Sequence, residues 1–489
     1  MLSYCTVVAL LPLVLGRSVS LNLETRAKYH STCLAIQHVI SHASQVFHPG
    51  NVPYVNDTSH WVPSSTQASA CSVEPGTVED VSKILKIIGR TSTPFAVKSG
   101  GHATNQGFSS TPGVHIALSR LNTVAYHQDS NTATIGAGLT WDRVYAELEP
   151  YGVTVPGGRI SGVGVGGFTL GGGYSWITNR RGLGIDNVVE YELVLPSGEI
   201  TTVTASSNPE LSFALRGGSN NFGIVTKFIF KTYRMGLGGV MTFAKSHIPL
   251  VLEAITDFAA NNTNPDANIV GTYIHAPGSA PELSILTFYN GPTLPLAIFD
   301  KFLSIPRASE DLRTRPFTDL ISAVSAPYLN PTHLRGAQHT VSLTGYTVDI
   351  LSQILNQTDF YAESGSFANG SLISVAIEPF LASGVSSFSA NDTAYPHNRY
   401  ISPLALFWGW PDERTDSTAM QDMERAAAAI TATAEGEGQQ LTDLALYNNY
   451  ALADTPLERL YTVNLPRLRS LKKKYDPRNI MNLAGGFRF

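Results

Sequence analysis

Apolar residues in the first half of the chain occur in short runs that turn-forming residues separate from one another. Runs of this length, rich in Val, Ile, Phe and Thr, are typical of strands. Helices are predicted over residues 25–46, after Thr140 and after Asn208, where a capping residue precedes a helical run. The predicted strands cover residues 95–97, 114–118, 134–135, 188–195, 200–204 and 223–232.

The pattern changes beyond about residue 236, where longer helical runs at 249–260 and 417–434 alternate with strands. In the last fifty residues, leucines again recur at helical spacing. We therefore expect an α+β protein with a first domain at 21–235, a second at 236–440 and a C-terminal segment at 441–489. A length of 489 residues agrees with two or three domains, at roughly 100–200 residues each.

Glycine is unevenly distributed, with 22 of the 42 glycines between Gly100 and Gly223. Glycine weakens helices and strands, so this density predicts backbone that passes close to another group. Two clusters stand out, at Phe95–His102 and Gly157–Gly173. Successive backbone N–H groups in such turns form a site for an anion such as a pyrophosphate.

The second cluster contains a match to the dinucleotide-binding pattern G-x-G-x-x-G at Gly162, Gly164 and Gly167, and Asp186 follows 19 residues later. The surroundings argue against that fold, because Pro156 breaks the preceding strand and a triple glycine at 171–173 interrupts the following helix. Glycine loops flanking short strands instead suit an extended cofactor.

Charge and composition exclude several classes of protein. The formal net charge is −5, and Lys472–Lys474, the one basic run, is expected to be a solvated helix face, so nucleic-acid binding is not predicted. Residues 1–16 form a short apolar segment typical of a secretory signal, predicted to span 1–20, and no later segment is apolar enough for a membrane anchor. Oligomeric state cannot be predicted from the sequence.

Other features agree with secretion. After removal of the signal, Cys33 and Cys71 remain and are expected to form a disulfide, although two separate buried thiols are the alternative. His38 and His42 lie one helical turn apart, but no carboxylate pattern accompanies them, so no metal site is predicted. Five Asn-x-Ser/Thr sequons are potential glycosylation sites: Asn56, Asn261, Asn356, Asn369 and Asn391.

Taken together, these segments resemble the vanillyl-alcohol-oxidase class of FAD enzymes, and within it the berberine-bridge-enzyme-like branch. The resemblance is densest over 61–232 and returns at 447–489. It implies a two-part FAD-binding domain of the PCMH type, with its core at about 61–235, and a substrate domain whose antiparallel sheet is covered by helices. The motifs that carry it are Ser99–His102, Gly162–Gly167, Ile185–Val188, Gly217–Gly223, Tyr447–Tyr450, Asn464–Leu468 and Lys474–Asn479.

The resemblance implies that His102 is bonded covalently to the flavin, although a turn histidine without that role is the alternative. Many relatives carry a second bond from a cysteine, but Ile160 stands at the matching position, so only the histidine bond is expected. Val163 occupies the position linked to oxygen access, which favours an oxidase. The expected cofactor-binding residues are Ser99, Gly100, Gly101, His102, Ala103, Gly162, Val163, Gly166, Gly167, Gly173 and Val225.

Two places are candidates for the catalytic base. One is Tyr450, which must be activated by nearby positive charge or hydrogen bonds, because a free tyrosine titrates near ~10. The other is a carboxylate on a strand before Pro396-His397, but the expected strand at 385–389 carries no acid. Tyr450 is therefore the predicted base, and His397 is expected either to line the substrate side or to make a structural hydrogen bond.

The sequence thus predicts a secreted FAD-dependent oxidase that takes two electrons from a small alcohol or secondary metabolite and reduces O2 to H2O2. Two alternatives stay open. One is a carbohydrate oxidase, and the other, of a different class, is a flavin-fold glycoprotein that binds or acts as a scaffold without redox chemistry.

Overall fold

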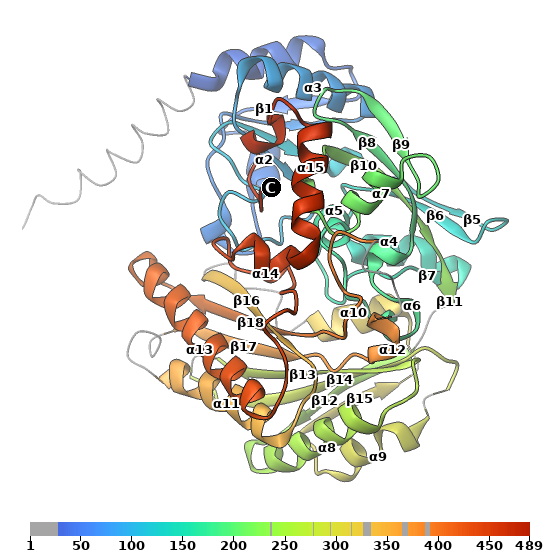
Figure 1. Ribbon diagram of the computed structural model, residues 1–489, viewed down its shortest axis with the longest axis vertical. Helices are drawn as coiled ribbons and strands as arrows, with labels where there is room; N and C mark the ends of the chain where they lie inside the picture. Colours follow the sequence, from blue (N-terminus) through green and yellow to red (C-terminus); the bar gives the residue numbers. More distant parts are fainter. Residues whose placement is uncertain are drawn as a thin grey trace, which may run out of the picture.

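The computed structural model describes residues 28–234, 237–276, 278–293, 295–313, 315–325, 334–363, 370–386 and 392–489. Its strands form two groups, which Figure 1 shows in the upper and lower halves of the molecule. The predicted signal segment 1–20 and the sequons at Asn369 and Asn391 lie outside the described residues.

The upper half contains a four-stranded sheet in the order β1-β2-β4-β3 and a five-stranded sheet in the order β5-β6-β10-β8-β9. In the first sheet, β2 and β3 both run parallel to β4, while the second sheet is antiparallel throughout. A two-stranded pair, β7 with β11, completes this half. The strands are β1 Gln45–Phe47, β2 Cys71–Glu74, β3 Phe95–Lys98, β4 Val114–Ala117, β5 Val124–His127, β6 Thr132–Gly136, β7 Val153–Thr154, β8 Val188–Val194, β9 Ile200–Val203, β10 Ile224–Lys231 and β11 Tyr233–Arg234.

The lower half is a seven-stranded antiparallel sheet in the order β15-β12-β14-β13-β17-β18-β16. Helices α8, α9, α11 and α13 cover its outer face, and its inner face is turned toward the upper half (Figure 1). The strands are β12 Leu237–Phe243, β13 Ala267–His275, β14 Glu282–Tyr289, β15 Ser309–Arg313, β16 Arg335–Leu343, β17 Leu372–Ile377 and β18 Ser402–Trp410.

After α13 the chain returns to the upper half, where α14 and α15 lie beside elements that are more than 200 residues earlier in the sequence (Figure 1). Lys472 on α15 donates to the backbone oxygen of Asn221. The helices are a segment at 28–39 and α2 Val52–Thr58, α3 Val78–Thr91, α4 Trp141–Leu148, α5 Val165–Leu170, α6 Thr178–Arg181, α7 Pro209–Leu215, α8 Ile248–Asn261, α9 Leu296–Ser304, α10 Phe317–Ser325, α11 Val348–Glu363, α12 Ala382–Val385, α13 Asp416–Gly436, α14 Leu457–Tyr461 and α15 Leu465–Tyr475.

The α+β class is confirmed, and each predicted strand before residue 235 corresponds to an observed one. Some local predictions were wrong. The N-terminal helix ends at residue 39, and residues 45–46 belong to β1. Thr140 and Asn208 occupy the N-cap positions of α4 and α7 but make no side-chain cap hydrogen bond.

The basic run on α15 is another correction, because only part of it is solvated. Lys472 is 2% exposed and forms an ion pair with the equally buried Asp476, at 2.7 Å. Asp476 also accepts the backbone N–H groups of Ile480 and Met481. Lys472 therefore anchors the C-terminal segment, whereas Lys473 and Lys474 are exposed as expected.

The predicted disulfide between Cys33 and Cys71 is present, and it ties the N-terminal helix to β2 in the interior of the four-stranded sheet. Asn56, Asn261 and Asn356 are exposed, as a glycosylation site requires. Among the residues that the structure describes, no helix combines the length and the apolar character needed to cross a membrane.

Candidate active site

The two glycine clusters pack directly against each other. A Cβ atom on Gly100 would lie 2.5 Å from the backbone oxygen of Gly162 and from the backbone nitrogen of Gly164, so only glycine fits there. Ser99 stabilises this contact, because its hydroxyl donates to Ala137 O at 2.6 Å and accepts a hydrogen bond from the backbone N–H of Gly166 at 3.3 Å. The backbones of both loops thus form one continuous wall.

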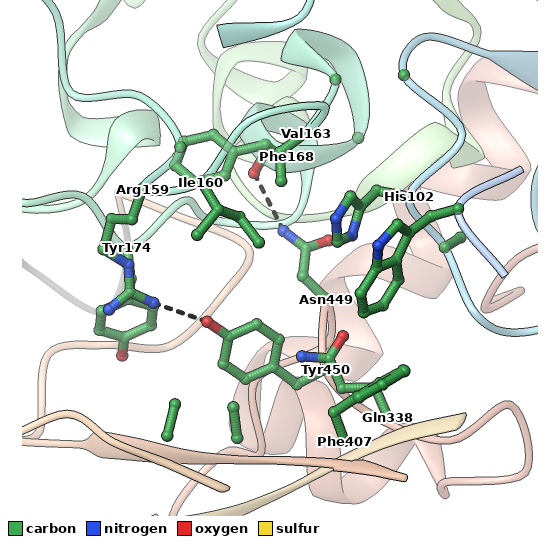
Figure 2. A pocket seen from close by; sticks show the side chains of 18 of the residues that line it. His102, Arg159, Ile160, Val163, Phe168, Tyr174, Gln338, Phe407, Asn449 and Tyr450 are labelled. Carbon is green, nitrogen blue, oxygen red and sulfur yellow. Dashed lines mark hydrogen bonds between the residues drawn. The ribbon is translucent and has the colours of Figure 1, made fainter. Parts of the chain in front are cut away.

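A cavity of about 300 Å³ lies between this wall and the inner face of the seven-stranded sheet. Figure 2 shows His102, Ile160 and Val163 on the glycine-loop side, with Gln338 and Phe407 on the sheet side. Tyr450 and Asn449, from the C-terminal segment, lie between the two walls. The cavity is therefore built from all three predicted segments of the chain.

His102 lines the cavity directly after the Gly100–Gly101 turn. Burial lowers the pKa of the imidazole to about 4, which keeps the ring neutral at physiological pH. The indole ring of Trp61 stacks on it, with ring centroids 4.2 Å apart and an interplanar angle of 13°. The Trp61 backbone N–H also donates to Gly101 O, at 3.0 Å. A neutral, oriented imidazole is the form that acts as a nucleophile.

Three charged or polar groups meet at the other end of the cavity. Arg159 Nη2 donates to the Tyr450 hydroxyl oxygen at 2.7 Å (Figure 2). It also donates to Glu378 Oε1 at 2.8 Å, and the Tyr450 hydroxyl donates to the same carboxylate oxygen at 3.2 Å. The Glu378 and Arg159 side chains are 3% and 10% exposed, so solvent screens their interaction little. This cluster can receive a proton.

The pKa shifts within the cluster distinguish the roles of its members. Burial raises the pKa of Glu378 above its usual value, while Arg159 acts in the opposite direction. Burial raises the pKa of Tyr450 well above 10, and the Glu378 charge adds to this, although Arg159 lowers it. A free tyrosinate is therefore disfavoured. The Tyr450 hydroxyl donates to Glu378 Oε1, so the carboxylate is placed to receive the Tyr450 proton.

Glu378 corrects the expectation that no carboxylate stands before Pro396. No strand begins at residue 385, because Ala382–Val385 form the short helix α12. The strand that precedes the segment is β17, which ends at Ile377, and Glu378 follows it immediately. The acid thus lies seven residues before Val385, and residues 387–389 of the expected strand lie outside the described residues.

The predicted flavin-binding residues divide into two sets. Ser99, Gly100, Gly101, His102, Ala103, Val163 and Gly167 line the cavity. Gly162, Gly166, Gly173 and Val225 do not line it. Gly162 and Gly166 support the loops, through N–H bonds to Asp142 and Ser99, Gly173 donates to the Tyr447 hydroxyl, and Val225 is buried in β10.

His397 and Asp186 have structural positions. His397 is fully buried, and its Nε2 lies 3.0 Å from Asp186 Oδ2. Asp186 also accepts the backbone N–H of Leu183. This pair joins the segment after β17 to the glycine-rich half. Neither residue lines the cavity. Asp186 therefore does not act as the acidic residue of a dinucleotide fold.

Several residues of the site were missed in the sequence. Arg159 and Asn449 directly precede Ile160 and Tyr450 in the sequence, and this position was the available signal. Trp61 is far from His102 in the sequence, and only the fold stacks the two rings. Asn449 donates to Phe168 O at 3.1 Å and to the Tyr447 hydroxyl at 2.9 Å, which connects the C-terminal segment with the second glycine cluster (Figure 2). The strand residues Gln338 and Phe407 carry no motif, and only the sheet brings them to the cavity.

A cavity walled by glycine loops, with a neutral histidine at one end and an acid–base cluster at the other, defines a flavin-dependent oxidoreductase. Comparison with known proteins agrees. Residues 69–204 match a family described as FAD binding domain, and residues 446–486 match one described as Berberine and berberine like.

The chain is 33% identical over 366 residues to an uncharacterized FAD-linked oxidoreductase of Arthroderma benhamiae, a match that covers 72% of this chain and 71% of the relative. It is 30% identical to an FAD-dependent monooxygenase of Emericella nidulans, over 91% of this chain and 96% of that one. A glucooligosaccharide oxidase of Acremonium strictum, described with a 6-S-cysteinyl, 8α-N1-histidyl FAD, has the same fold, with a TM-score of 0.75 at 20% identity over 92% and 97% of the two chains. This chain belongs to the berberine-bridge-enzyme-like family of FAD-linked oxidoreductases.

The residues of the cavity fit FAD. Gly167 faces the cavity, and a Cβ atom there would meet no protein atom within 4 Å, so the glycine leaves room for a ligand. Three buried polar atoms of the lining have no hydrogen-bond partner among the described residues, namely Arg159 Nη1, Trp176 Nε1 and Glu378 Oε2. Donors and acceptors left in this way are the groups that a bound cofactor and substrate satisfy.

Proposed function

We propose that the protein is a secreted oxidase that holds FAD covalently through His102 alone and oxidises a small alcohol or secondary metabolite with O2 as the electron acceptor. The observation that carries this proposal is the placement of a neutral imidazole and the Arg159–Glu378–Tyr450 cluster in one cavity. FAD supplies the two-electron acceptor, and O2 takes these electrons to form H2O2. The first and last parts of the chain would form the flavin domain, and residues 236–440 the substrate domain.

The histidine bond is proposed as the sole covalent link because Ile160 lines the cavity where many relatives carry cysteine, and an isoleucine side chain has no atom that can form a thioether. Ser99–Ala103 and the loop at Val163–Gly167 would hold the cofactor with their backbone. Val163, a small residue in the cavity wall, would leave oxygen access open.

The acid–base cluster has a defined part in the reaction. Tyr450 accepts the hydroxyl proton of the substrate while its own proton moves to Glu378 Oε1, 3.2 Å away. Arg159 donates to the Tyr450 oxygen, and its charge stabilises the negative charge that this oxygen carries while the two protons move. This proton transfer leaves the substrate carbon ready to lose its hydrogen with both bonding electrons.

The test begins with the visible spectrum of the purified protein, followed by acid precipitation and in-gel flavin fluorescence, for wild type and His102→Ala. We expect yellow colour that remains with the denatured wild-type chain and is absent from the denatured variant. Flavin released from denatured wild type would disprove the covalent bond. A folded protein without flavin would disprove the proposal and favour the binding or scaffold alternative.

The type of oxidation requires a second measurement. Because some relatives are described as monooxygenases, oxygen uptake and peroxide release are measured together with the mass of the product. Equimolar peroxide and a product two hydrogens lighter identify an oxidase. Incorporation of an oxygen atom from ¹⁸O2 identifies a monooxygenase, and turnover of sugars alone identifies the carbohydrate oxidase.

A further inference from the structure

The triple glycine at 171–173 lies against the C-terminal segment that carries Tyr450. A Cβ atom on Gly171 would lie 2.5 Å from Asn449 Nδ2 and closer still to the rest of that amide group. Gly171 itself has φ −96° and ψ −7°, a right-handed conformation that residues with side chains also adopt. Glycine is therefore required at this position by the close approach of Asn449 and not by the backbone conformation.

Asn449 uses both hydrogens of its amide nitrogen. Nδ2 donates to Phe168 O at 3.1 Å and to the Tyr447 hydroxyl oxygen at 2.9 Å. Phe168 lies in the last turn of α5, where backbone carbonyl groups have no partner inside the helix. The same Tyr447 oxygen accepts the backbone N–H of Gly173, at 3.0 Å. We call these three hydrogen bonds the α5 anchor, because they hold Tyr447 and Asn449 at the C-terminal end of that helix.

Tyr450 follows directly in the chain, and the anchored turn sets its direction. The backbone N–H of Tyr450 donates to Tyr447 O at 3.0 Å, and the two rings make an edge-to-face contact, with centroids 4.7 Å apart and an interplanar angle of 79°. The Tyr450 side chain then extends toward Arg159 (Figure 2). Its hydroxyl lies 2.7 Å from Arg159 Nη2 and 3.2 Å from Glu378 Oε1, and a shift of the turn by about 1 Å would break these hydrogen bonds.

We propose, resting on the acid–base role of Tyr450 in the proposed oxidase, that Asn449 is a positioning residue for the proton transfer. Through the α5 anchor it holds Tyr450 at hydrogen-bond distance from Arg159 and Glu378, and Gly171 leaves the space that its amide group needs. The amide group exchanges no proton with the substrate. Its effect reaches the reaction only through Tyr450, whose hydroxyl group must stay aligned for the transfer to Glu378.

A cycle of variants tests the packing of Asn449 against Gly171 without any substrate. We expect Gly171→Ala to lower Tm by about 2 °C or more, because its methyl group displaces the Asn449 amide from Phe168 O. In an Asn449→Ala background the amide is gone, so Gly171→Ala should leave Tm unchanged or raise it. Equal falls in Tm in both backgrounds would overturn the contact between the two residues.

Kinetics test whether Asn449 acts through Tyr450. Asn449→Asp keeps the size of the side chain and removes both donors. With benzyl alcohol and cellobiose as probes, we expect kcat per covalently bound flavin to fall about tenfold or more, and KM to change less than about threefold. In a Tyr450→Phe background, the same substitution should change kcat less than about twofold. An equal fall in kcat with and without the Tyr450 hydroxyl group would show a general structural effect and overturn the proposal.

A crystal structure of Asn449→Asp measures the position of Tyr450 directly. We expect the Tyr450 oxygen to lie beyond hydrogen-bond distance of Arg159 Nη2, instead of at 2.7 Å. A Tyr450 hydroxyl that keeps its contacts with Arg159 and Glu378 would overturn the positioning role. Failure of the wild-type protein to oxidise either probe would count against the oxidase function alone, because the Tm cycle and the crystal structure need no substrate.

Discussion

The two walls of the cavity are built from different parts of the polypeptide. The glycine-loop wall consists mainly of backbone, and its fit depends on the absence of side chains at Gly100 and Gly167. The sheet wall consists of side chains at alternate positions of strands that are far apart in sequence, such as Ala376 and Ala405. The first wall suits a cofactor common to a whole family, whereas the second can change its chemistry by substitution without changing the fold.

The acid at the end of β17 makes the sheet wall decisive for catalysis. We expect Glu378→Gln to lower kcat about 100- to 10,000-fold, because the proton from Tyr450 then has no carboxylate to receive it. Steady-state kinetics with the covalent flavin content measured in parallel checks this. Tyr450→Phe is expected to lower kcat by a similar factor. The double variant should lower kcat little more than either single variant, because the two residues act as a unit. Additive losses would contradict a shared role.

The pH dependence sharpens this prediction. Burial raises the pKa of Glu378 above its usual value, so the carboxylate is protonated at a higher pH than a free glutamate. The wild-type kcat should therefore fall as the pH falls through this raised pKa, and Glu378→Gln should lose this acidic limb. An unchanged profile in the variant would assign the limb to another group.

The glycine-loop wall is tested by adding one carbon. In Gly100→Ala the new methyl group would lie 2.5 Å from backbone atoms of Gly162 and Gly164, which cannot move independently. We expect a loss of about 3 kcal/mol or more in stability, and little covalent flavin. Gly166→Ala is the matched control, because its methyl group would meet its nearest atoms at 3.5 Å. Thermal unfolding measures the stability of both variants, and in-gel flavin fluorescence measures their covalent flavin. Equal stability and equal flavin content in the two variants would refute the close packing at Gly100.

A buried histidine behind the first wall should make this half of the molecule sensitive to acid. His115 on β4 is fully buried, and burial lowers its pKa to about 3. In the unfolded chain this histidine takes up a proton near pH ~6.5, whereas in the folded protein it stays neutral down to a much lower pH. Its contribution to the free energy of unfolding is therefore fully present above pH ~6.5 and decreases as the pH falls toward about 3. Between pH ~6 and ~4 the expected loss is about 2 kcal/mol.

Substitution removes this titration. His115→Phe should show a smaller fall in Tm between these pH values than wild type, while His127→Phe, at an exposed position on β5, should not. A fall in Tm that is the same in all three proteins would exclude His115 as the source.

The smallest expected effect concerns the contact that connects the walls. Trp61 stacks on His102 and also touches Phe407 of the sheet wall. Since an aromatic pair contributes about 0.5–1.5 kcal/mol, we expect Trp61→Ala to slow formation of the covalent flavin bond roughly two- to tenfold. Apoprotein mixed with FAD, sampled over time and denatured, gives this rate. Trp61→Phe should restore most of it, and an unchanged rate in Trp61→Ala would refute a positioning role.

The residues around His102 show how far local patterns extend. The strand at 95–98, the following turn and the histidine are contiguous, so the sequence alone was enough to predict their arrangement. Glu378 was missed for the opposite reason. Its place in the site depends on the end of β17 and on a short helix, α12, at a position where a strand was expected. Boundaries of this kind depend on tertiary packing, which overrides local propensity.

By itself, the sequence determined the α+β class, the glycine loops, the disulfide pair and the family, because each follows from neighbouring residues or from short motifs in a fixed order. Only the tertiary structure decided which side chains share the cavity. Arg159, Glu378 and Tyr450 are separated by 219 and 72 residues and carry no joint pattern, yet they lie within hydrogen-bond distance of each other. Strand pairing and the return of the C-terminal segment place them together, and these are long-range contacts that no local sequence pattern specifies.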